Sequence, residues 1–167
     1  MFTTVSGFLE SWKFESNGTS KILAALTDQS LTQAVTPVGR TLGRLAWHIT
    51  TTIPEMMGRT GLRLSGPGTD APTPSSARAI AGVYREAASS LAKAIQESWT
   101  DATLGVEDEM YGMKWTRSVT LGALISHQTH HRGQMTVLMR QAGLVVPGIY
   151  GPAREEWASM GVPPPEV

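Results

Sequence analysis

The sequence predicts an all-α fold, a four-helix bundle that occupies residues 1–167 as one domain. Apolar residues recur at helical spacing in four separate stretches, and no stretch alternates polar and apolar residues as a strand would. Glycine- and proline-rich segments separate these stretches. At 167 residues, the chain is long enough to bury a substantial core.

Local signals bound the first two predicted helices. The first helix is expected over about residues 3–26, with a weak point at Asn17-Gly18. After a break at Pro37-Val38-Gly39, Thr41 is the expected N-cap of the second helix. Pro54 is expected to end or kink this helix, because proline lacks the backbone donor and clashes with the preceding turn.

The second half of the chain repeats the pattern of helix, loop and helix. Residues 58–74 are rich in Gly, Pro, Ser and Thr and predict a long crossover loop, which permits the second and third helices to run parallel. The third helix is expected over about residues 75–99 and the fourth over about residues 118–142. The connection 100–117 is expected to carry a short extended piece. The proline-rich tail from about residue 146 is expected to wrap the bundle as irregular chain.

A short repeat places two histidines at equivalent points of two helices. Residues 41–48 and 120–127 share Thr, Leu, Gly, Leu and His at identical offsets. If the repeat is structural, its glycines allow close helix approach, and His48 and His127 lie at the same depth, about 10 Å past each Thr. The alternative is a chance match between two helices rich in Leu and Gly.

The fourth helix adds a second inward-facing histidine. His127 and His131 lie about 40° apart on the helical wheel, on the apolar side, whereas His130 points aside. Two imidazoles at this spacing can share one metal ion, and His48 would complete a three-histidine site with open positions, as in catalytic metal sites. The alternatives are ordinary core or surface histidines. A zinc-protease site is disfavoured because Gln128 occupies the position of that motif's basic Glu.

Four further residues are candidates for a pocket near this site. Glu55 lies in line with His48 on the second helix and is a candidate fourth ligand or general base, with a plain surface charge as the alternative. Trp47 and Trp115 are candidate pocket walls, with burial in the core as the alternative. Arg132 is expected to be an exposed helix arginine, with binding of an anionic substrate as the alternative.

The amino-acid composition limits the classes of binding partner and the location that we expect. Fourteen basic and 14 acidic residues cancel, which argues against nucleic acid or an anionic membrane as a partner. No apolar run approaches the roughly 20 residues of a membrane span, and the N-terminus lacks the features of a secretion signal. Cysteine is absent, which excludes disulfides and a cysteine nucleophile. A cytoplasmic protein is expected, in which any reactive thiol comes from a co-substrate.

Three motifs resemble the DinB superfamily, which includes YfiT-like metalloenzymes. The first covers residues 37–48 and contains Arg40-Thr41-Leu42-Gly43 before Trp47-His48. The second is the run His130-His131-Arg132-Gly133-Gln134, which follows His127. The third is the tail segment 147–152, which follows Leu138 and Gly143. The resemblance implies a four-helix bundle in up-down-down-up order, often homodimeric. It also implies a metal site on His48, His127 and His131. Members include thiol-dependent transferases and an isomerase that works with low-molecular-weight thiols.

The leading hypothesis is a divalent-metal-dependent enzyme, either a hydrolase or a thiol-dependent transferase. A divalent ion on three neutral imidazoles, zinc or nickel first, would lower the pKa of a water or a co-substrate thiol. A small-molecule substrate and a homodimer are expected. The alternative is a non-catalytic stress-response bundle with a structural or vestigial metal.

Overall fold

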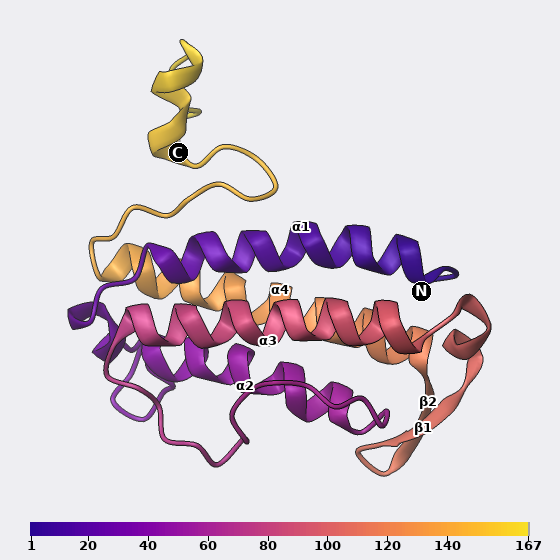
Figure 1. Ribbon diagram of the computed structural model, residues 1–167. Helices are drawn as coiled ribbons and strands as arrows, with labels where there is room; N and C mark the ends of the chain where they lie inside the picture. The colour runs from indigo at the N-terminus through magenta and orange to yellow at the C-terminus, as the bar shows by residue number, and fades with distance from the viewer. Residues whose placement is uncertain (167) are drawn as a thin grey trace.

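In the computed structural model, which describes residues 1–166, the chain is mostly helical with a small two-stranded sheet (Figure 1). The long helices are α1 (Val5–Ala24), α2 (Leu42–Gly58), α3 (Ala77–Ser98) and α4 (Arg117–Gln141). The 3-10 helices are η1 (Gln29–Thr32), η2 (Asp101–Gly105) and η3 (Arg154–Met160), and the strands are β1 (Glu107–Met110) and β2 (Met113–Thr116). None of the described helices is both long and apolar enough to cross a membrane.

Each long helix begins at a Ser or Thr whose hydroxyl accepts a hydrogen bond from a backbone N–H of the first turn. Such caps satisfy donors that have no partner inside the helix. The four caps are Thr4, Thr41, Ser76 and Thr116. The prediction that Thr41 caps the second helix is therefore confirmed. At the other end of α4, Gly143 has a φ of 72°, the left-handed conformation that commonly follows a helix.

Pro54 lies inside α2 and does not end it. The helix continues to Gly58, so of the two expectations for Pro54 the termination of the helix is wrong. The turn that follows includes Met56 and Met57, which are both buried. Burial of these side chains stabilises the last turn despite the missing backbone donor, since tertiary packing commonly outweighs local propensity.

The β1–β2 hairpin is the main departure from the predicted all-α fold. Its strands pair antiparallel, and the turn residues Tyr111 and Gly112 have φ values of 54° and 80°. Two residues with positive φ form the tight turn that matches the twist of paired strands. Three of the four residues of β1, Glu-Asp-Glu-Met, are not buried. Since these positions do not need apolar side chains, the strand lacks the alternation of polar and apolar residues that would have indicated it. The connection 100–117, expected to carry one short extended piece, thus contains two strands that pair as a hairpin.

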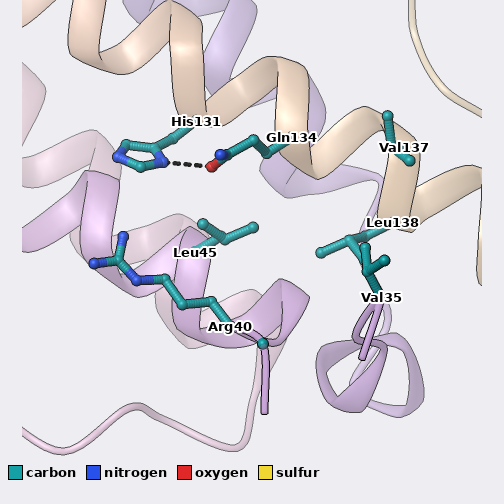
Figure 2. Close-up of a pocket in the computed structure, with 8 residues that line it drawn as sticks. Val35, Arg40, Leu45, His131, Gln134, Val137 and Leu138 are labelled. Atoms are coloured by element: carbon teal, nitrogen blue, oxygen red, sulfur yellow. Dashed lines mark hydrogen bonds between the residues drawn. The ribbon is translucent and has the colours of Figure 1, made fainter. Parts of the chain in front are cut away.

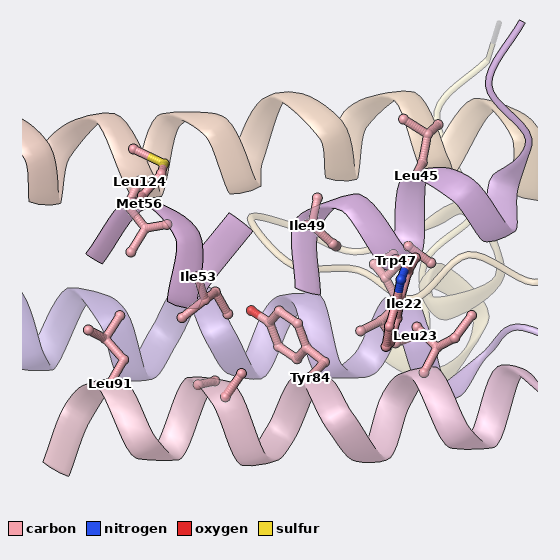
Figure 3. Packing of buried hydrophobic residues seen from close by; sticks show 14 of the residues in the cluster. Ile22, Leu23, Leu45, Trp47, Ile49, Ile53, Met56, Tyr84, Leu91 and Leu124 are labelled. Carbon is pink, nitrogen blue, oxygen red and sulfur yellow. The ribbon is translucent and has the colours of Figure 1, made fainter. Parts of the chain in front are cut away.

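The four long helices share one hydrophobic core. Helix α1 packs on α3 and α4, and α2 packs on the same two helices. Figure 3 shows the side chains that meet between them, among them Ile22, Ile53, Tyr84 and Leu124, one from each long helix. The long connection between α2 and α3 closes against this core, because the indole N–H of Trp47 donates to the carbonyl of Ala71 at 2.9 Å.

The C-terminal tail contacts the long helices at its start and again at η3, where Glu155 pairs with Arg140 of α4. Val146 is buried, and Ile149 lies so close to Gly18 of α1 that a Cβ at position 18 would be 2.7 Å from its Cγ2. Gly18 therefore permits close packing in an unbroken α1 instead of weakening the helix. Beyond this point η3 interrupts the expected irregular chain, and Figure 1 shows its ribbon standing away from the long helices.

Candidate metal centre

Three histidines from two helices meet at one point beside the core. His48 lies on α2, and His127 and His131 lie one turn apart on α4. The Nε2 atoms of His48 and His127 are 3.1 Å apart, and one nitrogen from each of the three rings lies within 4.8 Å of the others. His130 is exposed and outside this group, although its ring packs beside that of His131. The structure thus brings together the three histidines that the sequence selected.

The packing of α2 on α4 brings His48 to the two histidines of α4. Of the two glycines in the proposed repeat, only Gly43 permits a close approach between segments. A Cβ at Gly43 would lie 3.0 Å from the carbonyl oxygen of Leu31, so this glycine permits close approach of the segment that contains η1. A Cβ at Gly122 would meet nothing within 4 Å. The expectation that both glycines bring helices together is therefore wrong for Gly122, and Gly43 contacts a short 3-10 helix.

Burial keeps the three imidazoles neutral at neutral pH. The pKa of both His48 and His127 is lowered from 6.5 to about 4, mainly by burial and to a smaller extent by neighbouring imidazoles and Arg40. Burial also lowers the pKa of His131. A neutral imidazole presents one nitrogen lone pair, which is the form that binds a metal ion.

Hydrogen bonding fixes which nitrogen of His131 is free. Its Nδ1–H donates to the Oε1 of Gln134 at 2.7 Å, so Nε2 carries the lone pair. This arrangement resembles that of metal-binding histidines, which donate their other N–H to an acceptor that orients the ring. Gln134 lies three residues after His131, a spacing at which helix side chains meet.

The spacing of the ring nitrogens suits a shared metal ion. Two nitrogens that are each about 2.1 Å from a tetrahedral zinc are about 3.4 Å apart, close to the 3.1 Å between His48 and His127. The buried Nδ1 of His127 has no hydrogen-bond partner among residues 1–166. Since His127 presents its other nitrogen, Nε2, to His48, this Nδ1 is unpaired with or without an ion, and the spacing of the ring nitrogens is the observation that favours one. The three residues therefore fit a divalent cation.

The other predicted pocket residues make contacts of their own, although Glu55 lies near enough to His127 to act on its pKa, in the raising direction. The Glu55 carboxylate pairs with Arg59 at 2.8 Å and accepts a 2.6 Å hydrogen bond from the Tyr111 hydroxyl. Trp47 is buried in the core, and half-buried Trp115 packs edge-on against Tyr111 at 5.9 Å between ring centroids. None of the three belongs to the group of potential ligands within the described residues.

Two polar residues of α4 that flank the histidines face the core. Gln128 is fully buried, accepts a hydrogen bond from the Tyr84 hydroxyl at 3.2 Å and donates to the carbonyl of Ile49 at 2.8 Å. Arg132 is 2% exposed and pairs with Glu15 of α1 at 2.6 Å. The expectation of an exposed Arg132 is therefore wrong, because its partner lies on a distant segment that no local pattern reveals.

A cavity of about 460 Å³ opens beside His131. Figure 2 shows it between α4 and the segment that leads into α2. Its lining residues are Val35, Gly39, Arg40, Leu45, His131, Gln134, Val137 and Leu138. The sequence reasoning missed Arg40 and Gln134 as site residues, although Arg40 lies eight residues before His48 and Gln134 one turn after His131.

Comparison with known proteins places this architecture in a family. The sequence matches the DinB family over residues 1–166. It is 48% identical over 167 residues to the uncharacterized protein YrdA of Bacillus subtilis strain 168, with 100% of both chains aligned. A crystal structure of a DinB-like protein from Bacillus cereus ATCC 10987 is 49% identical, with a TM-score of 0.87 over 90% of this chain and 100% of that one.

A more distant structure shares the fold. The DinB-like protein YjoA of Bacillus subtilis is 18% identical, with a TM-score of 0.68 over 88% of this chain and 99% of that one. The family match covers all of the described chain, and the relatives above 45% identity are aligned over nearly all of it. The chain therefore belongs to the DinB family.

Proposed function

We propose that the protein is a divalent-metal-dependent enzyme, a hydrolase or a transferase that uses a low-molecular-weight thiol. His48, His127 and His131 would hold the ion. One observation carries the proposal: three neutral imidazoles converge at the wall of a cavity of about 460 Å³, to which His131 contributes its side chain. An ion held by these three ligands alone would keep open positions for a substrate, whereas a structural zinc site is usually closed by four protein ligands.

The chemistry divides between the ion and the chain. A divalent ion, zinc or nickel by the preference of imidazole ligands, supplies Lewis acidity that lowers the pKa of a nearby water or thiol. Gln134 orients the His131 ring, and the bond between Tyr84 and Gln128 anchors the helix between His127 and His131 in the core. Since the chain has no cysteine, a reacting thiol would come from the co-substrate.

The finer features of fold and assembly belong to the same proposal. We propose one domain in which four helices form an up-down-down-up bundle, which is supported by the long connection between α2 and α3 and by the helix directions in Figure 1. We propose a cytoplasmic homodimer. The exposed apolar side chain of Phe14 on α1 supports a contact between copies. Light scattering that gives a monomer mass across a wide concentration range would contradict the dimer.

Cobalt substitution tests the proposed function. Addition of 2-mercaptoethanol to the cobalt-loaded protein is expected to produce a new sulfur-to-metal charge-transfer band. The same addition to a His127→Ala variant is expected to produce none, and His130→Ala serves as the matched control that keeps the band. If cobalt occupies the wild-type site but neither thiols nor small anions alter its spectrum, the coordination sphere is closed. The protein would then be a non-catalytic bundle with a structural metal.

A further inference from the structure

The cavity beside His131 has a polar end and an apolar end. Figure 2 shows the guanidinium of Arg40 and the ring of His131 together on one side, with Gln134 next to His131. Val35 and Leu138 lie on the opposite side, with Val137 above them, and Leu45 lies between the two groups. Such a cavity matches a ligand that carries a polar head and an apolar body.

The polar end carries an uncompensated positive charge. The side chain of Arg40 makes no ion pair within residues 1–166, whereas Arg59, Arg117, Arg132 and Arg140 each pair with a carboxylate. None of the residues that line the cavity is acidic. Arg40 and His131 lie at the same end of the cavity, and a divalent ion on the three histidines would add to the positive charge of Arg40. Electrostatic complementarity therefore favours an anion at this end.

The remaining polar group also suits an anion. The Gln134 Oε1 accepts from the His131 N–H, which leaves both N–H donors of this amide for a ligand. A planar guanidinium can pair with a carboxylate in two parallel hydrogen bonds. The opposite wall is made of branched aliphatic side chains, of which Val35 and Val137 are 66% and 55% exposed. An apolar ligand chain would cover them.

We infer that the cavity binds a small monocarboxylate with an aliphatic chain, its carboxylate at Arg40 and its chain against Val35, Val137 and Leu138. The inference deepens the proposed function and rests on it for the role of this molecule as substrate. Arg40 would then select the substrate by charge. A cavity of about 460 Å³ is within the usual range for small-molecule sites.

Octanoate and 1-octanol are probes that differ in the charged head. Isothermal titration of the protein as purified, and again after removal of metal with a chelator, is expected to show binding of octanoate and much weaker binding of 1-octanol. Arg40→Gln is expected to weaken octanoate binding about ten-fold in the metal-free protein, the scale of one lost charge-assisted hydrogen bond. Arg44→Gln is the matched control, since Arg44 is an exposed arginine of α2 that does not line the cavity.

A second variant probes the apolar end. Val137→Asp places a negative charge on the exposed wall and is expected to abolish octanoate binding, with circular dichroism confirming an intact fold. Equal octanoate affinity in Arg40→Gln and wild type, equal affinity for octanol and octanoate, or no binding of octanoate would overturn the inference. Measurement of the metal content distinguishes failure of the carboxylate site from failure of the proposed metalloenzyme function. Arg40-dependent binding by a protein that holds no metal would support the carboxylate site while the metalloenzyme proposal fails.

Discussion

Arg132 of α4 and Glu15 of α1 form a buried ion pair, with Nη2 and Oε2 2.6 Å apart. Arg132 also donates to the Glu15 carbonyl at 3.0 Å and to the Thr19 hydroxyl at 3.1 Å. The Tyr150 hydroxyl donates to the Glu15 carboxylate and accepts from Arg132. This network joins α1, α4 and the tail. It lies next to the candidate metal centre, because Arg132 follows His131 in α4.

Replacement of Arg132 by Met is expected to lower the free energy of unfolding by about 3 kcal/mol. The substitution leaves the nearly buried Glu15 carboxylate without its cation, and breaking one side of a buried pair is far more costly than losing a surface pair. Chemical denaturation measures the change. Arg140→Met is the control, since the pair of Arg140 with Glu155 is exposed, and a much smaller effect is expected there. Equal losses in the two variants would contradict the prediction.

Much of the fold was predictable from local sequence. Three of its signals lie within single segments: the spacing of apolar residues, the capping hydroxyl of Thr41 and the glycine at position 143, which takes a left-handed conformation. Such signals can be recognised without the tertiary structure. The hairpin was not predictable, because the residues of β1 are largely unburied and carry no alternation. The burial of Arg132 depends on Glu15, which is 117 residues away in the chain.

The candidate site likewise has features that follow from local sequence and features that depend on contacts between distant segments. His127 and His131 are one turn apart, so their shared face follows from helix geometry alone. The approach of His48 depends on the packing of α2 on α4, for which the short repeat and the family resemblance were the sequence signals. The repeat gave the right histidine, although Gly122 has no close neighbour to explain it. Arg40 was overlooked because it lies in a loop, where no periodicity indicates direction.

Single replacements of His48, His127 or His131 by Ala are each expected to abolish stoichiometric metal binding. Each removes one of three nitrogens that lie within 4.8 Å of one another. His130→Ala is expected to preserve binding, because its exposed ring lies outside this group. Elemental analysis of protein purified without a histidine tag measures occupancy. Loss of metal in His130→Ala to the same extent would show that the other face of α4 carries the ligands.

Replacement of Gln134 by Leu is expected to weaken metal affinity by about 10- to 100-fold without unfolding the protein. The variant removes the acceptor for the His131 Nδ1–H, so the ring loses the contact that sets its orientation and keeps Nε2 free. Competition against a chromophoric chelator gives the affinity. Gln141→Leu, at an exposed position of the same helix, should behave like wild type. An affinity that is the same in both variants would show that His131 is oriented by its packing alone.

The metal-free protein is expected to lose stability as the pH falls from about 6.5 to about 4. Folding lowers the pKa of both His48 and His127 from 6.5 to about 4, mainly through burial. Across this interval the unfolded chain binds protons that the folded chain excludes, so acid favours unfolding, and the contribution of the neutral histidines is complete above pH 6.5. Urea denaturation at several pH values measures the trend. A variant with both His48 and His127 replaced by Ala should show a weaker dependence over the same interval, whereas His130→Ala should retain it. A wild-type midpoint that stays constant from pH 6.5 to pH 4 would mean that the histidines are as accessible to protons in the folded chain as in the unfolded one.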